Sequence, residues 1–220
     1  MSDSEESFRL KREQLIEYLK SRRAIKSREI EDAFLAIKRE LFVDERMKEL
    51  SYADDALPLS EGQTISQPST IAIMLELLGL KKGMKVIEVG SGCGYVVALL
   101  SKIVGDDGKV VGVEIIKKIA EKSRENLKEA GIKNAEIINK DACEGFAEKF
   151  DRILISAGCP FVPKKIFDAA EEKGRIVAPV GDRYTQMLET ITKFKDRPLK
   201  EQYSGSYFVF VPLKCKELKW

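Results

Sequence analysis

The chain contains no histidine. Serine and cysteine nucleophiles of the hydrolase type need an imidazole base, so Ser-His-Asp and Cys-His catalysis are excluded. Cysteine is also scarce, and none of its four residues forms a C-x-x-C pair. Without such a pair, and without histidine to complete the ligand set, a zinc site is not expected. The four residues are Cys93, Cys143, Cys159 and Cys215. We interpret them as reduced, mostly buried small side chains, and we expect no bound metal.

The chain also lacks a long apolar run and an excess of charge of one sign. Its first six residues, Met-Ser-Asp-Ser-Glu-Glu, are polar and acidic, unlike a secretory signal. No run approaches the roughly 20 apolar residues that a membrane helix needs. Lys and Arg number 38 against 36 Asp and Glu, so no global positive field would hold a polyanion. We therefore expect a cytoplasmic protein that binds neither membrane nor nucleic acid. We also expect a monomer, although nothing in the sequence gives the oligomeric state.

What the chain does contain is an alternation of short β-rich segments with helical patterns. Strands are predicted at Met84–Val89, Lys109–Glu114, Ala135–Asn139, Asp151–Ser156 and Gly174–Val180, and helices at Tyr95–Val104, Lys117–Ala130 and Lys164–Ala170. This order predicts an α/β fold with right-handed crossovers and a doubly wound, mostly parallel sheet. Gln186–Phe194 and Tyr207–Leu213 have no long helix between them, which predicts an antiparallel pair at the C-terminal edge.

The N-terminal part of the chain is predicted to be a helical extension followed by an irregular segment. Apolar residues recur at helical spacing from Phe8 to Lys20, and Ser27 begins a second helix. Between Phe42 and Pro68 the periodicity disappears, and a connection of that length is usually functional or disordered. A further helix, Thr70–Leu78, follows. At 220 residues the chain is expected to form one core.

Three glycines directly follow the first strand of the predicted parallel sheet, in the run Val-Gly-Ser-Gly-Cys-Gly that ends at Gly94. Glycines there permit a tight turn and a close approach of the backbone to a ligand. The next strand ends at Glu114, 20 residues later, where a carboxylate can accept both ribose hydroxyls of an adenosine cofactor. Together they indicate such a cofactor. Separately, each could be a turn without ligand or a surface charge.

The glycine spacing distinguishes between cofactors. A nicotinamide site has G-x-G-x-x-G on a pyrophosphate, whereas this chain has G-x-G-x-G after an acidic residue. That pattern resembles motif I of the class I methyltransferases, which use S-adenosylmethionine, and Lys140-Asp-Ala142 matches their adenine contact. The resemblance implies a Rossmann-like methyltransferase sheet and cofactor contacts from Glu88, Gly90, Ser91, Gly92, Gly94, Glu114, Ile115, Asp141, Ala142, Thr64 and Ile65. An Asx turn or a helix cap is the alternative role of Asp141.

The irregular segment carries Gly62-Gln-Thr-Ile-Ser-Gln-Pro68, which resembles the signature of the protein-L-isoaspartate O-methyltransferases. Further matches are Leu41-Phe-Val43, Leu57-Pro58, Ala178-Pro-Val-Gly181 and Phe210-Val-Pro-Leu213, so the resemblance spans residues 34–213. It implies methyl transfer from S-adenosylmethionine to the free carboxyl of L-isoaspartyl residues in damaged proteins. The products would be S-adenosylhomocysteine and a methyl ester that closes to a succinimide and reopens partly as normal aspartate.

The resemblance also implies individual site residues. Ser66 matches the active-site residue of the family, and Thr64 is the second catalytic candidate. Substrate contacts are expected from Ser66, Gln67, Pro68, Val209, Phe210 and Val211. The alternative role of Ser66 is an N-cap, because Ser followed by Gln-Pro suits the head of a helix. The chain departs from many members at Ser69, often aromatic or histidine, and at Ala142, often glycine.

The implied reaction suits a chain without histidine. A free carboxyl with a pKa near 3.5 is ionised at neutral pH, so it needs no general base. The enzyme must then mainly align the reactants, with hydroxyls on the carboxylate and the peptide bound as an extended strand. We expect residues 1–79 to carry the active-site loop and residues 80–220 to bind the cofactor. A class I methyltransferase for RNA or small molecules, and a non-catalytic cofactor-binding scaffold, are the alternatives.

Overall fold

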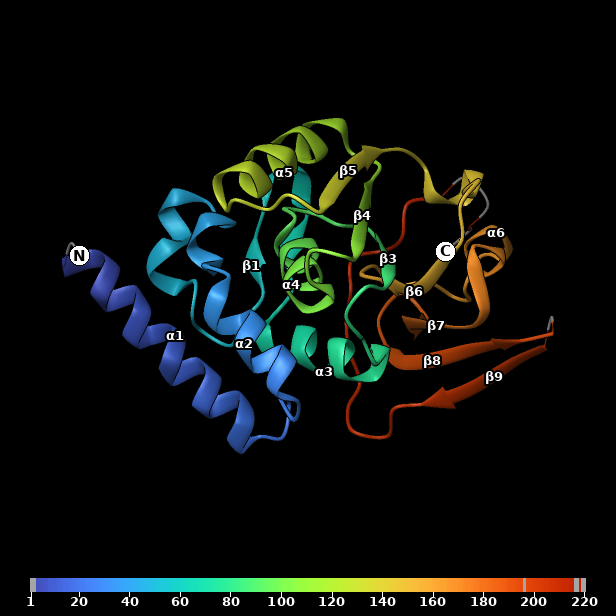
Figure 1. The fold of residues 1–220 in the computed structure, drawn as a ribbon, viewed down its shortest axis with the longest axis horizontal. Helices are drawn as coiled ribbons and strands as arrows, with labels where there is room; N and C mark the ends of the chain where they lie inside the picture. Colours follow the sequence, from blue (N-terminus) through green and yellow to red (C-terminus); the bar gives the residue numbers. More distant parts are fainter. Residues whose placement is uncertain (1–2, 196, 216–217, 219–220) are drawn as a thin grey trace.

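A seven-stranded sheet forms the centre of the computed structural model, which describes residues 3–195, 197–215 and 218 (Figure 1). The strand order is β5-β4-β3-β6-β7-β8-β9, parallel from β5 to β7 and antiparallel beyond. The strands are β3 Lys85–Val89, β4 Lys109–Glu114, β5 Ala135–Asn139, β6 Phe150–Ile155, β7 Ala170–Gly181, β8 Gln186–Phe194 and β9 Arg197–Gln202. The prediction of a doubly wound, mostly parallel sheet with an antiparallel edge is confirmed.

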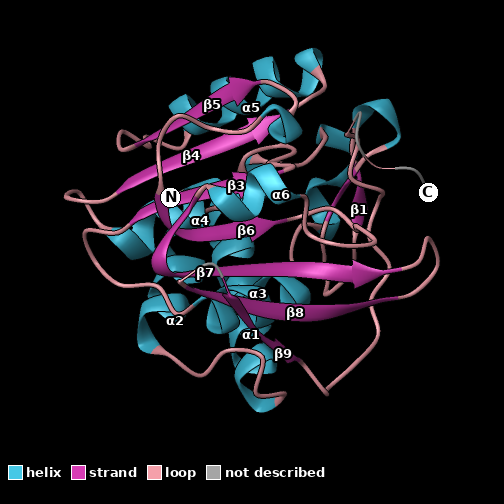
Figure 2. Ribbon diagram, turned by 90° about the vertical axis from the view of Figure 1, so that its right-hand side faces the viewer, coloured by secondary structure: helices cyan, strands magenta, loops and turns pink. Residues whose placement is uncertain are grey.

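The chain changes direction across the sheet beside β3. It runs outward from β3 through β4 to β5, and then returns to place β6 on the other side of β3. Figure 2 shows the strands in this order, from β5 at the top to β9 at the bottom. In open α/β sheets, ligands bind at the carboxyl ends of the strands beside such a reversal. In this fold, a ligand is therefore expected to bind at the residues that follow β3, β4 and β6.

Alternate residues of the buried strands supply two separate apolar clusters, one on each face of the sheet. Val86 and Val110 face the first cluster, with helices α3 (Pro68–Leu78), α4 (Tyr95–Val104) and α5 (Lys117–Glu129). Ile87 and Val111 face the second, with the short helix α6 (Lys164–Asp168). Strands buried on both faces read as continuous apolar runs, which explains why these strands were predictable.

The N-terminal helices pack onto the first cluster. Helix α1 spans Asp3–Ser21 and helix α2 spans Arg28–Ala36, close to the predicted pair. Leu15, Leu19 and Phe34 are buried in the same cluster as α3 and α4. The two helices thus extend the first apolar cluster, because the apolar side of each amphipathic helix is buried against it.

The irregular segment contains short regular elements that the sequence did not predict. They are the 3-10 helices η2 Glu45–Leu50 and η3 Ser60–Gly62, and the paired strands β1 Leu57–Pro58 and β2 Thr64–Ile65. A further 3-10 helix, η1 Arg39–Leu41, lies just before the segment. Elements of two to six residues are too short to show a periodicity. Buried polar contacts fix the segment: Tyr52 donates to Glu40 and accepts from Arg12, and Asp54 accepts from the Ser69 amide.

The predicted antiparallel pairing of Gln186–Phe194 with Tyr207–Leu213 is present at one bridge, Gln186 to Phe208, and is otherwise wrong. Strand β8 pairs with β7 on one side and with β9 on the other. The segment 207–213 makes only isolated bridges among the described residues, Gln186 to Phe208 and Gly158 to Pro212. The edge strand β9 is exposed along its whole length and charged. It therefore has no apolar pattern from which the sequence could predict it as the partner of β8. The apolar segment instead passes beside the end of β6.

The prediction of four reduced cysteines is also wrong. Cys143 and Cys215 form a disulfide across 72 residues of sequence, with their Cα atoms 5.8 Å apart. Cys93 and Cys159 are free and buried, as predicted. A separation of that size leaves no local signature, and only the fold brings the C-terminal segment beside the residues after β5.

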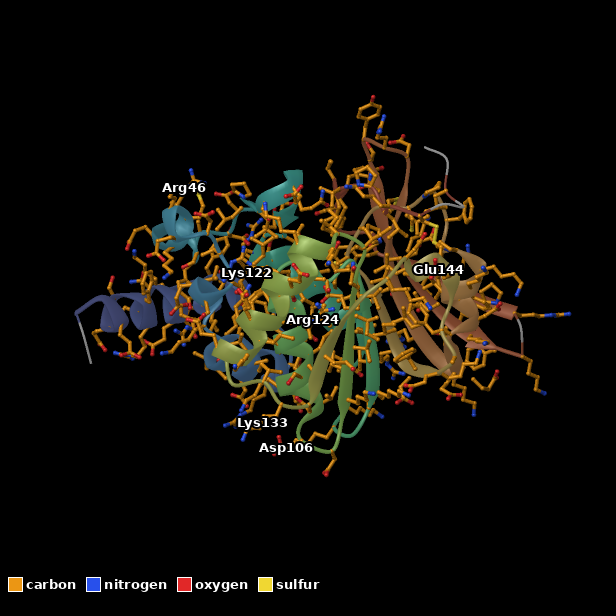
Figure 3. All side chains as sticks on the ribbon, turned by 90° about the horizontal axis from the view of Figure 1, so that it is seen from above. Arg46, Asp106, Lys122, Arg124, Lys133 and Glu144 are labelled. Carbon is orange, nitrogen blue, oxygen red and sulfur yellow. A yellow bond between two sulfur atoms is a disulfide. The ribbon has the colours of Figure 1, made fainter. Side chains whose placement is uncertain are left out.

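Exposed charges of both signs surround the molecule. The labelled side chains in Figure 3 are all exposed, namely Arg46, Lys122, Arg124 and Lys133 among the basic ones and Asp106 and Glu144 among the acidic ones. No helix in the described ranges has the length and apolar character needed to cross a bilayer.

Candidate active site

Three adjoining hollows lie at the carboxyl ends of the central strands. The first, here called the Glu114 cavity, opens between the turn after β4 and the C-terminal segment. Its lining includes Gly90, Gly92, Glu114, Ile115, Ile116, Lys140, Ala142, Ala157 and residues 211–214. The end of each central parallel strand contributes, as expected for a ligand site in a doubly wound sheet.

The second hollow, the Glu88 cavity, lies between the glycine-rich turn and the active-site loop. It is lined by Ile65, Ser66, Ile71, Met74, Glu88, Ser91, Cys93, Tyr95, Val96 and Leu154, together with Gly90 and Gly92. Because it shares both glycines with the Glu114 cavity, the two hollows adjoin along the glycine-rich turn, and together they are called the elongated space.

The third hollow, the Ser66 groove, opens toward the surface. One wall is the head of α3, with Ser66, Gln67, Ser69 and Thr70, and the other is the segment 206–211. Thr64 and Ser156 line all three hollows. They therefore mark the point where a molecule in the elongated space would meet one in the groove.

Ser156 was missed as a site residue. Its hydroxyl donates to Glu88 Oε1 at 2.6 Å, and it directly follows the end of β6. The place after a central parallel strand was the available signal.

The glycine-rich turn has backbone conformations that favour glycine. Gly90, Gly92 and Gly94 have φ angles of 79°, 51° and 87°, in the left-handed region where a side chain is strained. A Cβ on Gly94 would also lie 2.5 Å from the Ser123 hydroxyl. Gly94 is the N-cap of α4 and packs on α5, so it shapes the turn while Gly90 and Gly92 line the space.

Glu114 closes this turn from the neighbouring strand. Its Oε2 accepts a hydrogen bond from the Gly92 amide at 3.0 Å, and its Oε1 accepts one from the Ile116 amide at 2.9 Å. A carboxylate has about four acceptor positions. Two remain for a ligand in the cavity that this side chain lines.

Glu88 is a buried carboxyl at the other end of the elongated space. It is 1% exposed, and burial raises its pKa to about 8. The nearby Glu114 charge raises the pKa further, while the hydrogen bond from Ser156 lowers it. Its Oε2 has no hydrogen-bond partner within the described part of the chain. Glu88 therefore carries a proton at neutral pH until a cation approaches.

This proton makes stability depend on pH. The folded pKa of about 8 lies above the ordinary value of 4.5, so between these values the folded state keeps a proton that the unfolded state has lost. Stability present at acid pH should fall by about 5 kcal/mol as the pH rises through this window. Urea unfolding of the wild type and of Glu88→Gln from pH 5 to 8 should show the wild type losing stability relative to the variant. A pH-independent difference would contradict the raised pKa.

Ser66 is not the cap of α3. Gln67 is the N-cap, and Pro68 occupies the first helical turn. The Ser66 hydroxyl makes no hydrogen bond to the described residues, and the side chain lines both the Glu88 cavity and the Ser66 groove. The N-cap role considered for Ser66 is therefore wrong, and its contact with a bound molecule stays a prediction.

The segment 206–211 presents a free backbone edge to the groove. Phe208 exchanges two backbone hydrogen bonds with Gln186, at 2.9 and 2.8 Å, and the Phe210 amide donates to Gln186 Oε1 at 2.8 Å. The Val209 amide and carbonyl bond to none of the described residues, and its side chain is 76% exposed. Val209 can therefore pair with an added strand.

Three predicted site residues do not line these hollows. Gly94 packs behind the turn, Pro68 is buried in the first turn of α3, and Asp141 lies between the lining residues Lys140 and Ala142. Asp141 is the N-cap of η4 (Ala142–Glu144) and accepts from the Cys143 amide at 2.9 Å.

A metal site is not supported by the donor groups. Within the described ranges, one cluster has suitable donors, Asp141 with Cys143 and Cys215. Its two sulfurs are bonded to each other, so neither is a thiolate, the form in which cysteine binds metals.

The sheet, the glycine-rich turn after β3 and the carboxylate at the end of β4 are those of the Rossmann-like methyltransferase class. A solved structure from Plasmodium falciparum, assigned as a protein-L-isoaspartate O-methyltransferase in complex with S-adenosyl-L-homocysteine, has the same fold. Its TM-score is 0.81 at 29% identity, over 91% of this chain and 97% of that one.

Sequence comparison identifies the family within this class. The model of the protein-L-isoaspartate(D-aspartate) O-methyltransferase (PCMT) family matches residues 10–218. The chain is 39% identical to the protein-L-isoaspartate O-methyltransferase of Methanopyrus kandleri, over 99% of this chain and 97% of that one. It is 41% identical to protein-L-isoaspartate O-methyltransferase 2 of Archaeoglobus fulgidus, over 93% of each chain. The chain belongs to the protein-L-isoaspartate(D-aspartate) O-methyltransferase family.

Proposed function

We propose that this chain transfers the methyl group of S-adenosylmethionine to the free carboxyl of L-isoaspartyl residues in proteins. The observation that carries the proposal is the meeting of the elongated space and the open groove at Thr64 and Ser156. A methyl donor and a peptide must be held separately and brought together at one point, and the three hollows have this arrangement. Family membership and relatives of the same name support the proposal.

The residues of the elongated space fit S-adenosylmethionine. Glu114 has two acceptor positions left for ribose hydroxyls. Glu88 Oε2 and the Ser91 hydroxyl are buried without a hydrogen-bond partner in the described part of the chain, so they suit the charged amino-acid end. When bound, S-adenosylmethionine supplies an electrophilic methyl group on a sulfonium. Glu88 would give up its proton to face this cation, because an opposite charge favours the ionised carboxyl.

The groove residues would hold and align the peptide. The free backbone edge at Val209 can pair with an extended peptide, which would lay the peptide opposite Ser66 across the groove. The hydroxyls of Ser66 and Thr64 would donate hydrogen bonds to the reacting carboxylate. No side chain needs to remove a proton, since this carboxyl is already ionised at neutral pH.

Gln186 should control peptide binding. Replacing it with Met leaves the buried Phe210 amide unpaired, which costs about 1–3 kcal/mol, and loosens the segment that carries Val209. We expect the KM for an isoaspartyl peptide to rise about tenfold, with kcat and cofactor affinity nearly unchanged. Gln202→Met, at an exposed position of β9, is the matched control. An unchanged KM would show that Gln186 does not contribute to peptide binding.

The test of the function is methylation of two peptides that differ only at one linkage. Labelled methyl should pass to an isoaspartyl peptide and not to its normal aspartyl twin, and the product should then show a succinimide. Equal labelling of both peptides would reject the isoaspartyl specificity. Cofactor binding without labelling of either would favour the non-catalytic scaffold, and labelling of RNA or small molecules would favour a class I methyltransferase for those substrates.

The proposal includes a monomer that acts in the cytoplasm without nucleic acid. The near balance of 38 basic and 36 acidic residues supports the last point, because polyanion binding depends on excess positive charge. Residues 1–79 would carry the peptide-binding loop on the same core as the cofactor site.

A further inference from the structure

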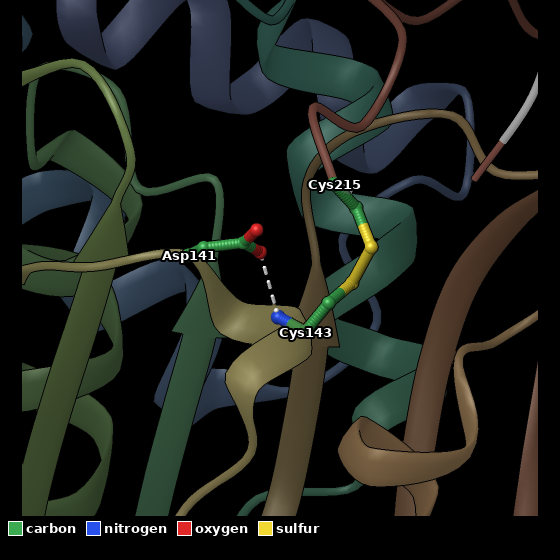
Figure 4. A group of neighbouring side chains, drawn as sticks. All are labelled: Asp141, Cys143 and Cys215. Carbon is green, nitrogen blue, oxygen red and sulfur yellow. Dashed lines mark hydrogen bonds between the residues drawn. A yellow bond between two sulfur atoms is a disulfide. The ribbon is translucent and has the colours of Figure 1, made fainter. Parts of the chain in front are cut away.

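The disulfide lies beside the Glu114 cavity, where the mechanism gives it no role. Cys143 follows Ala142, which lines the cavity, and its amide donates to Asp141 Oδ1 at 2.9 Å. Cys215 follows the segment 211–214, which lines the same cavity. Figure 4 shows the bond joining the C-terminal segment to the turn that contains Asp141.

In the described part of the C-terminal segment, the backbone hydrogen bonds to the rest of the fold lie before the disulfide. Val211 and Leu213 hold the segment to Gly158 through backbone hydrogen bonds of 2.9 and 2.8 Å. Past Leu213, the backbone hydrogen bond found in the described part of the chain, from Leu218 to Cys215, is local. Among the described residues past Leu213, the other attachments are the disulfide and the packing of Cys215 and Leu218 on the second apolar cluster.

We propose that the Cys143–Cys215 disulfide is a positioning element of the cofactor site, which holds the wall formed by residues 211–214 against the adenine side of the cavity. This inference rests on the proposed function. A dithiol reductant would convert the bond to two thiols and would itself become a disulfide. Reduction would remove the covalent tie at the C-terminal end of the wall, beyond the backbone hydrogen bonds that join Val211 and Leu213 to Gly158. That end of the wall would become more mobile, and cofactor affinity would fall.

Linkage makes the effect reciprocal. If reduction weakens cofactor binding tenfold, bound cofactor must stabilise the oxidised protein by the same factor. For a two-electron couple, a factor of ten corresponds to about 30 mV. Saturation with S-adenosylhomocysteine should therefore make the disulfide harder to reduce by this amount.

The experiment is calorimetric titration of S-adenosylhomocysteine into the oxidised, the dithiol-reduced and the reoxidised protein at 25 °C, each shown to be folded by circular dichroism. We expect about tenfold weaker binding after reduction and full recovery after reoxidation. Cys215→Ser should bind like the reduced protein under all conditions. Cys159→Ala, which removes a buried free thiol, should keep the redox response.

Two further measurements distinguish a role in the cavity wall from a role in the stability of the whole fold. They are hydrogen exchange of residues 211–215, and the midpoint potential of disulfide reduction with and without S-adenosylhomocysteine. Equal affinity of the folded oxidised and reduced proteins would overturn the inference, as would an unchanged midpoint or a lower melting temperature in Cys215→Ser without loss of affinity. Absence of any binding by the oxidised wild type would instead refute the proposed function.

Discussion

Replacing Glu114 with Ala is expected to weaken binding of S-adenosylhomocysteine at least about 100-fold. Two hydrogen bonds from ribose hydroxyls to a charged acceptor contribute about 1.5–3 kcal/mol each, and each 1.4 kcal/mol is tenfold in affinity. The variant also loses the two bonds that Glu114 accepts from the Gly92 and Ile116 amides, so the turn itself would loosen. Calorimetric titration measures the change directly.

The matched control for this variant is Glu136→Ala. Glu136 lies on the next strand and pairs with Lys109 at the exposed surface, where an ion pair contributes little. Both variants should be compared by circular dichroism before titration. If Glu114→Ala is folded and binds within threefold of the wild type, the assignment of the ribose contact to Glu114 is wrong.

Replacing Ser66 with Ala should reduce kcat for an isoaspartyl peptide about 10- to 100-fold and leave S-adenosylhomocysteine affinity nearly unchanged. The loss is one hydrogen bond to a carboxylate, about 1.5–3 kcal/mol, which acts on the rate because each 1.36 kcal/mol of barrier is tenfold. Stability should change little, because the Ser66 hydroxyl bonds to none of the described residues and the cap of α3 is Gln67.

Ser60→Ala is the control in the same segment, since Ser60 is exposed and begins η3. Steady-state rates with labelled methyl donor and saturating peptide would give kcat for both variants. A wild-type kcat in the Ser66 variant would remove Ser66 from the catalytic proposal and leave Thr64, which lines all three hollows, as the remaining hydroxyl candidate.

The parts of the fold that the sequence predicted are those with a strong local pattern. The strands β4 and β5 were predicted to the residue, and so was α4. β4 and α4 are buried along most of their length, so their sequences are strongly apolar. The charged edge strand β9 and the two-residue strands of the active-site loop have no such apolar pattern. Their pairing depends on residues elsewhere in the sheet.

The site residues likewise fall into those that the sequence predicted and those that it did not. Gly90, Gly92 and Glu114 were found from spacing, because a turn between strand and helix needs glycine locally and a parallel sheet places the end of the next strand beside it. Ser156 and Gln186 were missed, because each acts through a partner at a distance in sequence, Glu88 in one case and Phe210 in the other.

The sequence by itself thus determined the class of fold, the family resemblance and the polar groups around the glycine-rich turn. Tertiary structure alone decided that three hollows meet at Thr64 and Ser156, that Glu88 is buried enough to keep its proton, and that Cys143 bonds to Cys215. The physical reason is the distance along the sequence over which each property is determined. Backbone conformation and strand periodicity are set by neighbouring residues, whereas burial, a raised pKa and a disulfide across 72 residues arise only when distant segments pack together.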